Sequence, residues 1–143
     1  MNNQETIDYL VQHGIKPSVQ RMAVMEYLLS HHTHPTADEI HSALTARIPT
    51  LSKTTVYNTL RLLVDNGAAT QLTIDERNVC FDAEARPHAH FLCNCCGKVY
   101  DLPLRQVDID AAAEIPESFR TESAALYYRG KCAACTRAES HRQ

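Results

Sequence analysis

Residues 36–67 read TADEIHSALTARIPTLSKTTVYNTLRLLVDNG, and this segment carries the strongest structural signal in the chain. Thr36 is followed three residues later by Glu39, the spacing of a capping box at a helix N-terminus. This helix ends by Pro49, and a second helix is predicted over about 53–66, where apolar residues recur at helical spacing. Two helices joined by a short turn predict a helix-turn-helix.

The elements around this segment extend the pattern. Helices are predicted over 5–13 and about 18–31, and two short strands over about 69–74 and 79–82. Helices followed by a hairpin occur in this order in a winged helix-turn-helix. In that fold, the second helix of the helix-turn-helix enters the major groove of DNA. The alternative is a plain helical bundle with a trailing hairpin.

The helix predicted to enter the groove begins with side chains suited to phosphates and base edges. The candidate phosphate contacts are Lys53, Thr55, Arg61 and Arg21, and the candidate base contacts are Tyr57 and Asn58. Ser52, a possible N-cap of this helix, also belongs to the candidate DNA-binding set. Taken singly, each also fits a solvated helix face. Residues 1–83 carry six Lys and Arg against nine Asp and Glu, so a bound cation or dimerisation has to offset this acidic balance.

The whole chain reads as an α+β protein with two domains. We predict a winged-helix DNA-binding domain at 1–82, a hinge at 83–87, and a small α/β dimerisation and metal-binding domain at 88–143. Within the last, strands are expected at about 89–93, 98–102 and 120–129, with a helix from Pro103 to about Glu114 and a cysteine-bearing tail.

Composition narrows the function classes. The formal charge of −3 gives no basic bias from which to infer a nucleic-acid partner. No run approaches the roughly 18 apolar residues of a membrane span. The start MNNQETIDYL lacks the basic-then-apolar order of a signal peptide. We therefore expect a cytoplasmic protein with no membrane partner.

Two CxxC pairs, Cys93-Cys96 and Cys132-Cys135, are separated by 35 residues. Each pair supplies half of a tetrahedral site, and four thiolates form a closed site that fits Zn(II) and leaves no position for catalysis. Redox CxxC motifs and disulfides are the alternatives. Cys80 and Cys95 do not fit this arrangement and are interpreted as ordinary small side chains.

His88 and His90 alternate on a predicted strand, so both imidazoles point to one face. With Asp82 and Asp101 on the flanking strand ends, they suggest a reversible site for Fe(II), Mn(II) or Zn(II), although a surface pair is also typical of this spacing. His31, His32, His34 and His41 surround the helix start at the capping box, and most of these four histidines fit solvated loops.

Two other classes remain open at this point. A zinc hydrolase or deaminase would use His88, His90 and Asp101, with Glu84 as the general base. A zinc-stabilised interaction module would not bind DNA at all. The chain has no Gly-rich phosphate loop and no nucleophile motif, so we do not expect an enzyme.

Four segments together resemble the ferric uptake regulator (Fur) family: PTADEI at 35–40, SKTTVYNTL at 52–60, HAHFLCNCCGK at 88–98 and GKCAAC at 130–135. The resemblance covers roughly residues 5–136. It implies a homodimeric, metal-dependent transcriptional repressor whose winged helix binds palindromic operator DNA. It also implies structural zinc at Cys93, Cys96, Cys132 and Cys135.

The resemblance further implies a regulatory ion between the domains, held by His34, Asp82, His88, His90 and Asp101 and consistent with Fe(II) or Mn(II). Aspartate at 101 favours the peroxide-sensing branch over the iron- and zinc-responsive branches. Oxidation of His34 or His88 is then the expected response. Ser123 and Ala124 stand where other members carry a histidine, so a third metal site is not expected.

Overall fold

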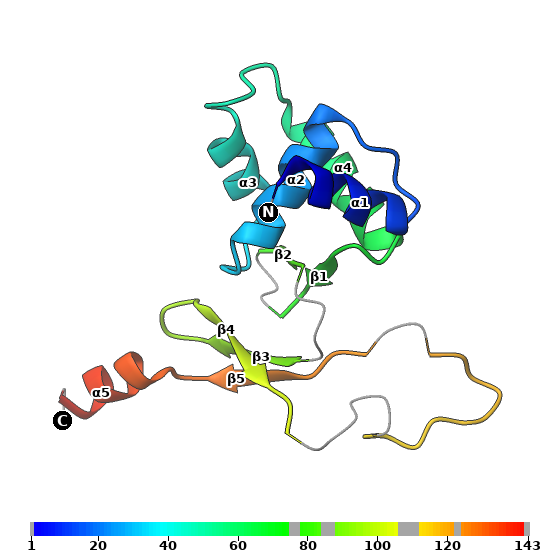
Figure 1. The fold of residues 1–143 in the computed structure, drawn as a ribbon. Coiled ribbons are helices and arrows are strands. Elements are labelled where there is room, and N and C mark those ends of the chain that lie inside the picture. The colour runs from blue at the N-terminus through cyan, green and yellow to red at the C-terminus, as the bar shows by residue number, and fades with distance from the viewer. Residues whose placement is uncertain (1, 75–77, 84–87, 106–111, 122–123, 142–143) are drawn as a thin grey trace. The chain divides into compact units, whose positions relative to one another are not determined.

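The computed structural model describes residues 2–74, 78–83, 88–105, 112–121 and 124–141. The chain divides into two compact units, Met1–Ala85 and Arg86–Gln143, each with its own fold (Figure 1). Apart from Ala83, the predicted hinge at 83–87 lies outside the described residues. None of the helices in the described part of the chain has the length and apolar character needed to cross a bilayer.

The first unit is a winged helix-turn-helix, as predicted. Its helices are α1 (Asn3–Gln12), α2 (Val19–Ser30), α3 (Ala37–Leu44) and α4 (Lys53–Asp65). The wing is an antiparallel ribbon of β1 (Thr70–Leu72) and β2 (Cys80–Asp82), in which Thr70 pairs with Asp82. The first helix begins two residues before the predicted start because Asn2 and Glu5 form a capping box.

Local hydrogen bonds define where helices of this unit begin and end, as the start of α3 and the end of α4 illustrate. The Thr36 hydroxyl accepts from the backbone N–H of Glu39 at 3.2 Å, which caps α3. At the end of α4, Gly67 has φ of 74°, a left-handed backbone that favours glycine. The N–H of Ala68 then donates to the carbonyl of Leu63 at 2.8 Å, which closes the helix.

The apolar sides of the helices meet in one core in this unit. Helix α2 packs against α1, α3 and α4. The fully buried side chains include Leu10, Met25, Leu28, Ile40, Val56, Leu60 and Leu63. Because Val56 and Leu60 face the core, the opposite side of α4 is exposed, and Tyr57 on that side is 52% exposed. The core therefore determines which face of α4 is available to a partner.

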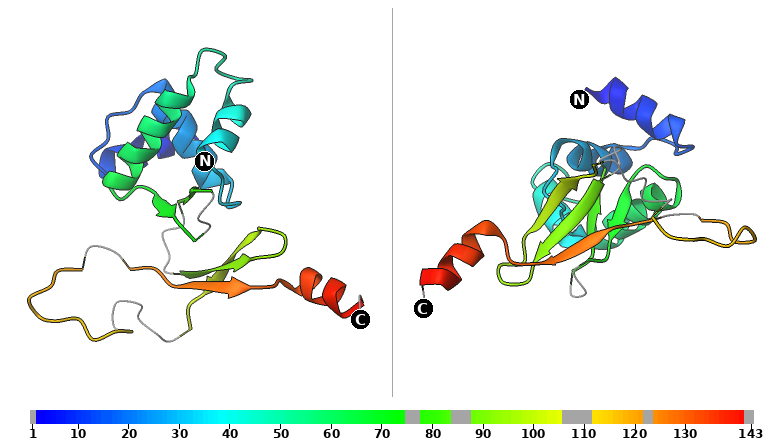
Figure 2. Two further views of the ribbon diagram at one scale, coloured as in Figure 1. Left: turned by 180° about the vertical axis from the view of Figure 1, so that it is seen from behind. Right: turned by 90° about the horizontal axis from the view of Figure 1, so that it is seen from below.

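The second unit is a three-stranded sheet followed by a helix (Figure 2). Its elements are β3 (His88–Cys93), β4 (Val99–Pro103), β5 (Tyr127–Gly130) and α5 (Ala133–His141), with the strand order β4-β3-β5. The central strand β3 runs antiparallel to β4 and parallel to β5. This topology brings the C-terminal ends of β3 and β5 to the same edge of the sheet.

Two sequence predictions in this unit are corrected. Pro103 ends β4 instead of starting a helix; residues 104–105 and 112–114 are not helical, and 106–111 lie outside the described residues. Proline fits there because β4 is an edge strand, where a missing N–H is tolerated. The strand predicted at 120–129 begins only at Tyr127, since β3 offers it partners from His90 onward. The cysteine-bearing tail forms α5.

Candidate metal centres and DNA-binding surface

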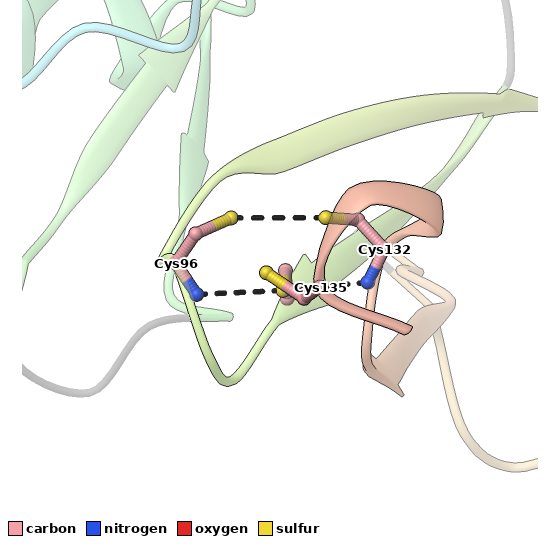
Figure 3. Close-up of side chains that lie close together, drawn as sticks. Cys96, Cys132 and Cys135 are labelled. Carbon is pink, nitrogen blue, oxygen red and sulfur yellow. Dashed lines mark hydrogen bonds between the residues drawn. The ribbon is translucent and has the colours of Figure 1, made fainter. Parts of the chain in front are cut away.

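The two CxxC pairs meet where β3 and β5 end side by side. The four Sγ atoms of Cys93, Cys96, Cys132 and Cys135 all lie within 4.8 Å of one another. The Sγ atoms of Cys96 and Cys132 are 3.9 Å apart (Figure 3). Tetrahedral zinc with bonds of about 2.3 Å places its sulfurs about 3.8 Å apart. The cluster therefore fits Zn(II). None of the six cysteines forms a disulfide, which is one of the two alternatives left open by the sequence.

A tight turn builds the first half of this cluster. The N–H of Gly97 donates to the carbonyl of Cys93 at 2.8 Å, and the N–H of Cys93 donates to the carbonyl of Lys98 at 3.0 Å. Gly97 has φ of 78°, so the turn requires a residue without a side chain at that position. The turn brings the Cys93 and Cys96 sulfurs to the same side of the chain.

Hydrogen bonds favour the thiolate form that binds metal at two of the four sulfurs, those of Cys93 and Cys132. The pKa of the other two thiols, Cys96 and Cys135, is raised, for Cys135 mainly by its hydrogen bond with Cys132. The Cys93 Sγ accepts from the backbone N–H of Cys132 at 3.3 Å and of Cys96 at 3.4 Å. These donors lower the pKa of the Cys93 thiol to about 6. The backbone N–H of Cys135 and the hydroxyl of Tyr100 lower the pKa of Cys132, and the bond to Cys132 raises the pKa of Tyr100 to about 12.

A second cluster lies on the β3–β4 pair of the same unit. The Nε2 atoms of His88 and His90 are 2.9 Å apart. The Oδ1 atom of Asp101 is 3.2 Å from Nε2 of His88 and 3.3 Å from Nε2 of His90. Asp101 arrives there because it pairs with His90 across the two strands. Adjacent ligands of an octahedral ion with bonds of about 2.1 Å lie about 3 Å apart, so these three donors suit one ion.

Within the first unit, His34 and Asp82 lie close together. A ring nitrogen of His34 and a carboxylate oxygen of Asp82 lie within 4.8 Å of each other. They are close because the N–H of Phe81 donates to the carbonyl of Pro35 at 2.9 Å, which ties β2 to the loop before α3. His34 has φ of 57°, a left-handed backbone that costs a residue other than glycine about 1–2 kcal/mol.

His32 is a further residue near this pair, and sequence reasoning assigned it to a solvated loop. Its Nδ1 atom lies 3.9 Å from Oδ1 of Asp82, and its side chain is 49% exposed. The signal that could have found it is its spacing from His34, which is the same as that of His88 from His90. Glu84, the base of the hydrolase alternative, lies outside the described residues.

The predicted DNA contacts fall into three groups. Arg21, Thr55 and Asn58 line part of a groove of about 200 Å³ between α2 and α4. Lys53, Tyr57 and Arg61 are exposed along α4, and Lys53 Nζ lies 3.8 Å from Oδ1 of Asp38. The hydroxyl of Ser52 accepts from the N–H of Thr55 at 3.1 Å, so this side chain already serves as the N-cap of α4.

Comparison with known proteins identifies the family. The chain is a winged helix-turn-helix protein with a cysteine cluster that fits zinc. The sequence model of the ferric uptake regulator family matches residues 12–129. The peroxide-responsive repressor PerR of Staphylococcus aureus (strain Mu50 / ATCC 700699) is 38% identical over 133 residues, covering 92% of this chain and 90% of that protein. The chain therefore belongs to the ferric uptake regulator family.

Other relatives agree with this assignment. The peroxide-responsive repressor PerR of Staphylococcus epidermidis is 36% identical over 92% of this chain and 89% of its own length. Among solved structures, the Vibrio cholerae ferric uptake regulator (Fur) matches with a TM-score of 0.66 at 25% identity, covering 88% of this chain and 98% of that one. PerR from Streptococcus pyogenes matches with a TM-score of 0.52 at 27% identity, covering 93% and 92%.

Proposed function

We propose that the chain is a metal-dependent transcriptional repressor that senses peroxide through a regulatory Fe(II) or Mn(II) site. The observation that carries the proposal is the cluster of His88, His90 and Asp101, whose donor atoms lie 2.9–3.3 Å apart. Imidazole and carboxylate donors without thiolate suit these ions. The relatives named peroxide-responsive repressors support the sensing role.

In this proposal, one ion is shared by two ligand sets. His34 and Asp82 belong to the first unit, and His88, His90 and Asp101 belong to the second. Residues 1–82 are the DNA-binding domain, 88–143 the dimerisation domain and 83–87 the hinge. A shared ion would restrict the hinge, so metal binding and DNA binding would strengthen each other by the same factor.

The second unit is proposed to carry structural zinc on its four cysteines and to dimerise. Phe119 is 68% exposed and Tyr128 is 50% exposed, and both are side chains that a dimer interface would bury. A two-fold dimer places two recognition helices about 34–36 Å apart, the spacing of palindromic half-sites on DNA. The first unit carries more acidic than basic residues, so a bound cation would reduce its electrostatic repulsion from DNA phosphates.

Peroxide sensing is proposed to act on the histidine ligands. An Fe(II) ion held by these residues would promote cleavage of the O–O bond of hydrogen peroxide. In the net reaction an imidazole would lose two electrons and gain one oxygen atom, and the other oxygen would leave as water. His34 and His88 are the side chains we expect to gain an oxygen atom, and an oxidised imidazole is a poorer ligand. The cysteine thiolates are not the expected sensors, because zinc occupies them.

The experiment that tests peroxide sensing is mass spectrometry of the zinc-containing protein reconstituted with Fe(II) and treated with hydrogen peroxide. We expect a mass increase of 16 on the peptides that contain His34 or His88, together with release of operator DNA. The matched control is the Mn(II)-loaded protein under the same treatment, which should keep both peptides unmodified. Oxidation confined to cysteines, with both histidines intact, would contradict the proposal.

If α4 binds DNA, removing the Lys53 side chain, which is 64% exposed, should weaken DNA binding without abolishing it. Lys53→Ala should weaken operator binding about equally for all sequences and reduce the slope of log affinity against log salt by about 1, the signature of one lost phosphate contact. Fluorescence anisotropy over a salt series measures both. Asp38→Ala removes the partner of Lys53 and should leave affinity unchanged or raise it. An unchanged slope for Lys53→Ala would exclude this contact.

A further inference from the structure

We infer that His32 is a positioning residue for the regulatory ion, acting through the carboxylate of Asp82. The inference rests on the proposed function, since it concerns the ion that Asp82 is proposed to bind. It adds to the five proposed ligands a sixth residue, one whose role is to orient a ligand instead of binding the ion.

The geometry around Asp82 is the basis of the inference. Nδ1 of His32 lies 3.9 Å from Oδ1 of Asp82, and the Asp82 side chain is only 3% exposed. A carboxylate that binds an ion through one oxygen has a second oxygen that takes a hydrogen bond, and such bonds hold the ligand in the orientation that the metal requires. A hydrogen bond from an imidazole N–H needs about 3 Å, so a movement of less than about 1 Å brings His32 into range.

The position of His32 in the chain makes this movement accessible. His32 follows the end of α2 at Ser30 and precedes Thr36, the N-cap of α3. Its side chain is half exposed, so few packing contacts have to break when the ring turns. Asp82 is fixed by comparison, because it pairs with Thr70 in the wing.

The neighbouring histidine is oriented differently and provides a control. Nδ1 of His31 lies 3.0 Å from the carbonyl oxygen of Tyr27 and 3.2 Å from the Ser30 hydroxyl. The ring of His31 also stacks on that of Tyr27, with centroids 4.1 Å apart. His31 therefore faces the last turn of α2, whereas His32 faces Asp82.

The test is a titration of zinc-containing protein with Mn(II), in which electron paramagnetic resonance measures the free ion. Loss of a hydrogen bond to a metal ligand typically lowers affinity by about 10–100-fold. We expect His32→Ala to weaken Mn(II) binding by at least about tenfold. His32→Asn should recover most of the affinity, since its amide nitrogen can take the place of Nδ1. His31→Ala should bind like the wild type.

Each result bears on a different statement. Wild-type affinity in His32→Ala would overturn the inference and leave the proposed regulatory site intact. Equal weakening in His32→Asn and His32→Ala would also overturn it, because the effect would not depend on a donor. A wild-type protein that binds no Mn(II) or Fe(II) would contradict the proposed function itself, and the inference would fail with it. Thermal unfolding followed by circular dichroism should give the same midpoint for all three variants.

Discussion

Replacing Cys93 with serine is expected to abolish zinc binding and unfold the second unit. Cys93 is fully buried, and its sulfur accepts two backbone hydrogen bonds that hold the two CxxC pairs together. The described part of this unit contains only three short strands and one helix, too little apolar material to stabilise a fold without a metal. Structural zinc contributes about 10–16 kcal/mol of binding free energy in small domains.

Elemental analysis and circular dichroism measure this effect. We expect zinc to fall from about one ion per chain, the content of a closed four-cysteine site, to almost none in Cys93→Ser. Cys95→Ser is the matched control: it makes the same substitution two residues away, at an exposed position of the same turn. It should retain zinc and fold. Full zinc content in Cys93→Ser would show that the four cysteines are not the zinc site.

Replacing His90 with alanine is expected to eliminate metal-dependent DNA binding while zinc content stays unchanged. His90 pairs with Asp101 across the strands, its Nε2 is 3.3 Å from Oδ1 of Asp101 and 2.9 Å from Nε2 of His88, and its loss removes one of the three donors of the cluster. Loss of a residue that hydrogen-bonds a metal ligand lowers metal affinity by about 10–100-fold. Loss of a ligand itself should lower the affinity by more than about 100-fold.

Two titrations check this prediction. Mn(II) binding measures the site directly, and fluorescence anisotropy with operator DNA, with and without added Mn(II), measures the coupling. We expect added Mn(II) to strengthen DNA binding of the wild type but not of His90→Ala. His13→Ala, which replaces the histidine at the end of α1, is a control that should respond like the wild type. A normal Mn(II) response in His90→Ala would refute the proposed ligand set.

The helices of the first unit were predictable because their signals are local. Ser18, Thr36 and Ser52 are N-caps in the structure, and the apolar residues behind them line one core. The cysteine cluster was also predictable, since each CxxC pair fixes its own half of the site and only the meeting of the halves needs the fold.

The second unit was harder to predict because its strands depend on partners far away in the sequence. Pro103 is an acceptable start for a helix and an acceptable end for an edge strand, and only the pairing of His88 with Pro103 decides between them. In the same way, β5 extends only as far as β3 can pair with it. His32 was missed for a similar reason, since its contact is with Asp82, fifty residues along the chain.

The backbone at His34 has a consequence for how this protein can change over time. Its left-handed conformation is one that glycine or asparagine would adopt with less strain, by about 1–2 kcal/mol for glycine. Selection for a robust fold alone would therefore drive the imidazole out of this position. Descendants that no longer respond to metal should lose this histidine early and gain thermal stability when they do.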